Sequence, residues 1–430
     1  MSKEKAEFRN PWAWVPSLYY AEGVPYALVM LVSVIMYKRL GISNAEIGFY
    51  TGILYLPWVI KPLWSPIIDM IKKKRFWIII MQFVVGIGLL GVSLSIPASN
   101  FLLYTLIFFF LMAFSSATHD IAADGFYMLG LDVHQQAYFT GIRSTFYRIA
   151  IITAQGVLVI IAGELEKSKG IPQAWQTVFL ILTGLFFLFF IYHQFILPYP
   201  KSDKPVTNTE TDNPIKNFLR TFVLFFKRDN IILIIAFLLI YRLGEAQLIT
   251  IAQPFLKDPR SVGGLGLTTI QIGFVYGTVG VIALSIGGII GGLVAAKNGL
   301  KFWLWPMFIA INIPALVYIT LSYLMPTSFY VISGLVAIEQ FCYGFGFTAY
   351  MLYMIYIVSG EFKTSHYAIA TGFMALSMMI PRLFSGVIQE MLGYQHFFVW
   401  VLITMIPGFF IVKSIKIDPE FGKKVEKAKE

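Results

Sequence analysis

The sequence predicts an all-α polytopic membrane protein with twelve transmembrane helices in two pseudo-symmetric six-helix bundles. Hydrophobic residues make up 57% of the 430-residue chain and charged residues only 13%, whereas a soluble protein has roughly 25% charged residues. Apolar segments long enough to cross ~30 Å of hydrocarbon recur along the chain. One polar stretch divides these segments six and six.

The predicted segments fall on either side of that stretch. The first six are 13–37, 46–69, 76–96, 101–131, 137–163 and 174–197, and the last six are 231–256, 268–296, 301–324, 328–359, 365–392 and 395–415. The stretch 198–230 is rich in Pro, Thr, Asn and charge, which is typical of a solvated linker. We therefore expect an N-terminal bundle over 1–197, a cytoplasmic linker over 198–230, a C-terminal bundle over 231–415 and a cytoplasmic tail over 416–430.

The distribution of Lys and Arg predicts the orientation. If the N-terminus lies inside, 22 of these residues fall on the cytoplasmic side and 6 in outer loops. This bias places both termini and the linker in the cytoplasm. The net charge of +10 then serves anchoring and orientation, and we expect no nucleic-acid partner. The charged N-terminal stretch lacks the apolar core of a cleaved signal peptide, so we expect none.

Short matches between the two halves indicate an internal repeat. They recur at offsets of 225, 226 and 221 residues: Ile47-Gly48-Phe49 with Ile272-Gly273-Phe274, Phe76-Trp77 with Phe302-Trp303, and Tyr20 and Gly23 with Tyr241 and Gly244. The nearly constant offset predicts two parallel six-helix repeats.

Two carboxylates lie inside the fourth apolar segment. Asp120 and Asp124 are one helical turn apart and so share a face, with His119 beside them. Charges at membrane depth usually mark an ion or substrate path. They could form a structural ion pair with Arg143 or Arg148, or at least one could gain and lose the proton of a symporter. Glu22, next to Gly23, is a further proton-carrying candidate or a solute ligand.

Other polar residues at membrane depth are candidates for solute binding. Arg148 lies deeper than Arg143 and suits a carboxylate or phosphate. Lys61 could reach the interface, bind a solute carboxylate or pair with Asp120. Arg242 and Glu245 could form an internal ion pair. The full candidate set is Arg148, Lys61, Tyr20, Arg242, Glu245, Gln247, Glu339, Gln340 and Arg382.

The residue pattern favours transport over catalysis. The five histidines form no metal or nucleophile constellation, and no phosphate-binding Gly-Lys-Ser/Thr loop occurs. We expect no metal, no cofactor and no enzymatic activity, with a membrane acyltransferase as the least favoured alternative. The partners that we expect are a small-molecule solute, protons and the lipid bilayer.

The loop after the second segment, LWSPIIDMIKKKRFW, resembles the signature of the major facilitator superfamily, Gly-x-x-x-Asp-Arg followed by basic residues. Asp69 and the basic run match, while Ser65 and Met70 replace the glycine and the arginine. The resemblance implies a charge latch that biases one access state, formed by Asp69, Lys72, Lys73, Lys74, Arg75 and Arg143. The alternative is a plain positive-inside anchor.

Three stretches resemble one branch of that superfamily, the AmpG muropeptide permeases and acetyl-coenzyme A transporters. They are YYAEGVPYALV, Lys61-Pro-Leu-Trp-Ser-Pro-Ile-Ile-Asp69 and Ala117-Thr-His-Asp-Ile-Ala-Ala-Asp-Gly125, all within residues 1–150. His119 stands where the branch usually has Gln. The resemblance implies a cavity lined by helices 1, 4, 7 and 10.

The same resemblance implies a function: proton-driven import of anhydro-muropeptides for cell-wall recycling, by alternating access. Transport of acetyl-coenzyme A or another anionic solute is the alternative. We expect a monomer in the bacterial inner membrane.

Overall fold

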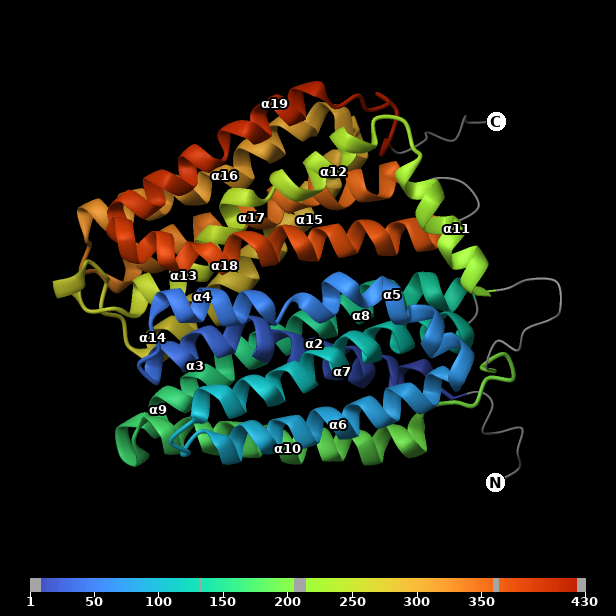
Figure 1. Ribbon diagram of the computed structural model, residues 1–430, viewed down its shortest axis with the longest axis horizontal. Coiled ribbons are helices and arrows are strands. Elements are labelled where there is room, and N and C mark those ends of the chain that lie inside the picture. Colours follow the sequence, from blue (N-terminus) through green and yellow to red (C-terminus); the bar gives the residue numbers. More distant parts are fainter. Residues whose placement is uncertain (1–8, 132, 205–213, 359–362, 424–430) are drawn as a thin grey trace. The chain divides into compact units, whose positions relative to one another are not determined.

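The computed structural model describes residues 9–131, 133–204, 214–358 and 363–423. All regular structure in these ranges is helical (Figure 1), which confirms the predicted all-α class. Ten helical stretches of the described residues are long and apolar enough to cross a membrane.

The ten stretches fit the twelve predicted segments. The longest, His366–Ser414, has 49 residues and contains Gly393, whose backbone (φ 70°, ψ 169°) is not helical, so two helices meet there. The second predicted segment is divided into α4 (Asn44–Ile53) and α5 (Leu56–Ile71), which have 10 and 16 residues. Each helix is shorter than the roughly 20 residues needed to span a bilayer, so neither is one of the ten membrane-spanning stretches.

The chain forms two compact units. Unit 1 comprises 1–41, 54–218 and 269–277, and unit 2 comprises 42–53, 219–268 and 278–430. The helices of unit 1 are η1 (Pro11–Ala13), α2 (Val15–Ala27), η2 (Leu28–Val32), α3 (Ser33–Arg39), α5, α6 (Lys74–Ser95), α7 (Phe101–Gly130), α8 (Val133–Ile151), η3 (Ile152–Leu158), α9 (Val159–Lys169), α10 (Ile171–Ile196) and α14 (Thr269–Ile272).

Unit 2 contains the second set of helices. They are α4, α12 (Ile231–Ile240), α13 (Leu243–Lys257), η4 (Arg260–Val262), α15 (Val281–Asn298), α16 (Leu300–Leu324), α17 (Phe329–Ile357), α18 (Lys363–Thr404) and α19 (Ile406–Ser414). Two elements, α11 (Pro214–Phe226) and η5 (Gly273–Gly280), have residues in both units.

Helix α4 comes from the first half of the sequence but packs against α18 within unit 2. The backbones approach closely because Gly386 has no side chain: a Cβ there would overlap the carbonyl oxygen of Asn44. Asn44 Nδ2 donates to Gln389 Oε1 (2.6 Å) and to Tyr394 Oη (3.0 Å). These contacts hold the start of α4 in place.

Helix α14 shows the opposite arrangement: it comes from the second half of the sequence but packs against α9 within unit 1. A Cβ at Gly163 would lie 2.8 Å from Ile270 Cγ1. Thr269 Oγ1 donates to Glu166 Oε2 (3.0 Å), and Glu166 also receives the guanidinium of Arg39 (2.9 Å).

Two of the sequence matches occupy similar local structures. Phe76 and Trp77 meet edge to face at 5.7 Å, and Phe302 and Trp303 do so at 5.4 Å. Phe76 and Trp77 lie in the first turn of α6, and Phe302 and Trp303 lie in the first turn of α16. This similarity fits the predicted internal repeat.

The first helical stretch, Pro11–Arg39, is the most deeply buried of the ten, with 83% of its apolar window inside the protein. Its residues are apolar around the whole circumference, as expected for a helix surrounded by others. Trp14, the residue before α2, and Leu18 of α2 pack with Ala122 and Phe126 of α7 in the core of unit 1. A polar side chain on α2 therefore lies in the interior of this unit.

Candidate functional site

The two acids of α7 each face a cation from a different helix. Lys61 of α5 donates to Asp120 Oδ2. Arg143 of α8 donates to Asp124 Oδ1 over 3.0 Å. Of the three roles predicted for Lys61, the structure shows the pairing with Asp120. Of the two arginines predicted as partners of Asp124, the structure shows Arg143 in contact with it.

Tyr19 of α2 completes the Asp124 pair. Its hydroxyl donates to Asp124 Oδ1 (3.1 Å) and accepts from Arg143 Nη1 (2.9 Å). The Arg143 guanidinium also lies 5.1 Å from the ring centre of Tyr19 and 5.0 Å from that of Tyr127, within the range of cation–π attraction. The position of Arg143 is therefore fixed by contacts from both α2 and α7.

Glu22 brings a third carboxyl group to the same place. It is 8% exposed and lies within hydrogen-bonding reach of Asp120. Its Oε2 is buried and has no hydrogen-bond partner in the described part of the chain. Two carboxyl groups can hydrogen-bond to each other only if one of them carries a proton, so Glu22 and Asp120 are candidates to share one.

The backbone of α2 explains how Glu22 reaches this position. A Cβ at Gly23 would lie 2.8 Å from Ala150 Cβ and 2.9 Å from the carbonyl oxygen of Tyr147. Only glycine allows α2 and α8 to approach so closely. Pro25 follows within the helix, and the π-helical turn η2 begins at Leu28. Such irregular turns inside helices are frequent at functional sites.

Arg148 differs from the other cations of unit 1. It is half-buried on α8 and forms no hydrogen bond or ion pair with any described residue. Tyr147 lies near Glu22 and Asp120, whereas Arg148 is the next residue along the helix and projects about 100° away. Arg148 is thus a cation available to an anionic group.

The predicted latch is described only in part, because the side chain of Asp69 lies outside the described residues. The basic run begins α6, where Asp203 accepts from the backbone N–H groups of Lys74 (2.8 Å) and Arg75 (3.1 Å). The Arg75 guanidinium lies 3.9 Å from the ring centre of Tyr199. Lys72 and Lys73 are exposed.

His119 belongs to a hydrogen-bond chain that includes three residues absent from the sequence-based site: Gln82, His193 and Ser17. Gln82 of α6 lies between two histidines, 3.0 Å from His119 Nε2 and 2.9 Å from His193 Nδ1. His193 Nε2 then meets Ser17 Oγ at 2.9 Å. The chain joins α7, α6, α10 and α2. Gln82 and His193, which are polar residues in apolar segments, are its signals in the sequence.

Unit 2 has its own charged cluster, at a break between α12 and α13. Arg242 forms a bidentate pair with Glu245, with both N–O distances 2.7 Å and both side chains 5% exposed. Arg242 Nη2 also donates to Tyr343 Oη (3.1 Å), and its guanidinium lies 4.6 Å from the ring centre of Phe347. The predicted ion pair between Arg242 and Glu245 is therefore present, and aromatic rings lie against the guanidinium of Arg242.

The remaining candidates are held mainly by neighbours. Gln247 bonds to Thr404 (3.1 Å) and to the indole of Trp400 (3.0 Å). Gln340 Nε2 donates to the adjacent Glu339 Oε1 over 2.8 Å. Arg382 is 1% exposed on α18, and its carbonyl oxygen lies against Gly48. In unit 1, Tyr20 packs against Phe189 of α10, at 5.9 Å between ring centres.

Comparison with known proteins places these clusters in a family context. Residues 21–386 match the model of the Major Facilitator Superfamily. The sequence is similar to "Putative transporter AmpG 4" of Rickettsia conorii, with 24% identity over 91% of this chain and 92% of that one. It is also similar to the "Anhydromuropeptide permease" of Escherichia coli K12, with 23% identity over 92% and 77% of the two chains.

Solved structures with the same fold include a D-xylose–proton symporter, with a TM-score of 0.73, 13% identity and coverage of 96% and 99% of the two chains. A bacterial homolog of the human lysosomal transporter Spinster gives a TM-score of 0.69, 14% identity and coverage of 93% and 95%. At this identity the likeness shows the fold alone.

Proposed function

Because the chain belongs to the major facilitator superfamily, we propose that it is a proton-coupled importer of anhydro-muropeptides that works by alternating access. It is a multi-pass membrane transporter of small solutes and not an enzyme. The similarity of this chain to the anhydromuropeptide permease supports this choice of cargo.

The observation that supports proton coupling most directly is the contact between Glu22 and Asp120. Among the described residues, the three carboxyl groups of Glu22, Asp120 and Asp124 meet two cations, Lys61 and Arg143. A hydrogen bond between the carboxyl groups of Glu22 and Asp120 would need a proton on one of them. When that proton leaves, two like charges face each other at membrane depth, which is costly. A transport cycle can use this cost to link proton release to a change of conformation.

Solute binding in this proposal uses Arg148 of unit 1 and aromatic residues of unit 2. Arg148, which has no ion-pair partner among the described residues, offers its guanidinium to a carboxylate of a peptide-bearing sugar. In unit 2, Tyr343 and Phe347 around Arg242 offer flat apolar faces on which sugar rings can stack. Lys61, Tyr20, Gln247, Glu339, Gln340 and Arg382 stay candidate solute contacts.

The remaining expectations belong to the same proposal. We place the protein in the bacterial inner membrane as a monomer, with both termini in the cytoplasm, on the bias of Lys and Arg. The basic run at the start of α6 acts with Asp69 as the latch. We retain the N-terminal bundle, linker, C-terminal bundle and tail predicted from the sequence.

Uptake into proteoliposomes tests the cargo. Vesicles with an inward proton gradient receive a labelled N-acetylglucosaminyl-anhydro-muramyl peptide, and parallel vesicles receive labelled acetyl-coenzyme A. We expect accumulation of the muropeptide, abolished when the gradient is collapsed, and no accumulation of acetyl-coenzyme A. Uptake of acetyl-coenzyme A without uptake of the muropeptide would replace the proposed cargo by its alternative.

A further inference from the structure

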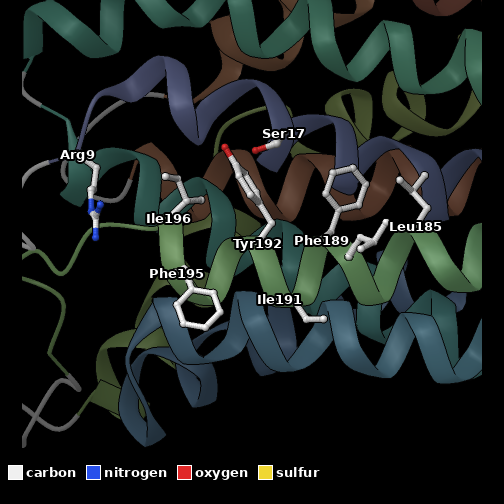
Figure 2. Close-up of a pocket in the computed structure, with 9 residues that line it drawn as sticks. Arg9, Ser17, Leu185, Phe189, Ile191, Tyr192, Phe195 and Ile196 are labelled. Atoms are coloured by element: carbon white, nitrogen blue, oxygen red, sulfur yellow. The ribbon is translucent and has the colours of Figure 1, made fainter.

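A groove of about 880 Å³ runs along the outer side of α10 in unit 1 (Figure 2). Leu185, Leu188, Phe189, Ile191, Phe195 and Ile196 of α10 supply most of its lining. Leu188 and Phe195 are 64% and 71% exposed. In a protein that crosses the membrane, such exposed apolar side chains face hydrocarbon chains.

The length of the groove matches one leaflet of a bilayer. Leu185 and Ile196 are eleven residues apart, so the helix between them rises roughly 16 Å. The hydrocarbon core of a bilayer is about 30 Å thick, and one leaflet supplies about half of it. A single acyl chain lying along α10 would therefore reach from one end of the groove to the other.

The polar groups inside the groove are already hydrogen-bonded. Ser17 Oγ bonds to His193 Nε2 (2.9 Å) and to the carbonyl oxygen of Trp14 (3.2 Å). Tyr192 Oη donates to the carbonyl oxygen of Ala13 (2.5 Å). The groove wall therefore offers an apolar surface to an occupant, which suits an acyl chain better than a polar solute.

A cation lies at one end of this apolar wall. Figure 2 shows Arg9 at the end of the groove near Phe195 and Ile196, with Leu185 at the opposite end. Arg9 Nε is buried and has no hydrogen-bond partner in the described part of the chain. An anion bound to Arg9 would satisfy this donor.

We propose that this groove binds an anionic phospholipid, with one acyl chain along α10 and its phosphate on Arg9. The apolar wall recognises the chain, and the unsatisfied donor at its end recognises the head group. The proposal commits to a lipid of the surrounding bilayer, since the groove is apolar and opens where hydrocarbon would contact the helix. It does not depend on which solute the protein transports.

Native mass spectrometry of the purified full-length protein tests this site. The protein is stripped of lipid with detergent and titrated with phosphatidylglycerol or with phosphatidylcholine of the same chain length. One arginine at a membrane surface contributes ~1 kcal/mol of attraction, so we expect about a fivefold preference for phosphatidylglycerol. Inorganic phosphate is added in a competition arm to separate head-group binding from binding of a free anion.

Two pairs of variants locate the site. Arg9→Gln should reduce the preference to that of phosphatidylcholine, whereas Lys413→Gln, which removes a positive charge from α19, should leave it unchanged. Leu188→Trp fills the groove and should weaken retention of both lipids, whereas Leu180→Trp, at an exposed position of α10 outside the groove, should not.

Three outcomes would overturn the proposal. They are equal retention of the two lipids by the wild type, an unchanged preference in Arg9→Gln, and displacement of the lipid by millimolar inorganic phosphate alone. Thermal unfolding of each variant in the same detergent confirms that the protein compared is folded.

Discussion

Lys61 on α5 pairs with Asp120 on α7, and the same Asp120 meets the carboxyl group of Glu22 on α2. A single carboxylate thus lies next to both an ammonium group and a second carboxyl group that can exchange a proton. One helical turn away, Asp124 has a separate set of partners, Tyr19 and Arg143. The two acids of α7 therefore have different surroundings, and we expect them to differ in function.

The Lys61–Asp120 pair should show strong energetic coupling. Substituting only Lys61→Met leaves Asp120 without its cation, and substituting only Asp120→Asn leaves Lys61 without its anion. We expect a coupling free energy of about 1–3 kcal/mol from a double-mutant cycle of thermal unfolding, as for groups in direct contact. Additive effects of the two substitutions would show that the pair contributes no net stability.

Gln82 should stabilise unit 1 through its two histidines. Gln82→Leu leaves His119 and His193 buried without their shared partner, which should lower the free energy of unfolding by about 1–3 kcal/mol. Gln173→Leu, at an exposed position in the first turn of α10, is the matched control and should have little effect. Equal stability of the two variants, measured by chemical unfolding, would exclude a structural role for the hydrogen-bond chain.

The close contact of α4 with α18 should depend on Gly386. Gly386→Ala places a methyl group against the carbonyl oxygen of Asn44, and such overpacking costs about 1–3 kcal/mol. Gly334→Ala in α17 is the control, because nothing lies near its added methyl group. The control should be neutral or stabilising by up to about 1 kcal/mol, since alanine favours the helix. Thermal unfolding in one detergent compares the two.

Arg148 should affect solute affinity more than stability. Arg148→Gln removes no described ion pair, so we expect wild-type thermal stability and a KM for uptake raised about tenfold, which corresponds to ~1.4 kcal/mol. Arg143→Gln removes the partner of Asp124 and should lower stability as well. A wild-type KM in the Arg148 variant would remove this residue from the proposed solute contacts.

The sequence predicted the fold class well because the bilayer imposes its length and polarity on every helix. It also located Glu22, Asp120 and Asp124, since a carboxylate in an apolar segment is conspicuous. It could not decide which arginine pairs with Asp124: Arg143 and Arg148 differ by about 140° around their helix, and only tertiary packing chooses between them.

Other features depend on contacts between distant parts of the chain and had no local sequence signal. Tyr19 bonds to Asp124 across 105 residues, and Asp203 in the predicted linker caps α6 across 129. The packing of α4 with α18 likewise depends on two helices more than 300 residues apart. Periodicity identifies an apolar helix, but it does not identify the helix that covers it.

Proton-driven uptake by the Glu22→Gln variant tests the central claim most directly. Proteoliposomes with an inward proton gradient are compared with proteoliposomes that exchange labelled muropeptide for unlabelled muropeptide without a gradient. Glu164→Gln, which changes an exposed carboxylate of the same unit, is the control. We predict that Glu22→Gln keeps the exchange but loses gradient-driven accumulation. Wild-type accumulation by Glu22→Gln would contradict the claim that the Glu22–Asp120 contact carries the coupling proton.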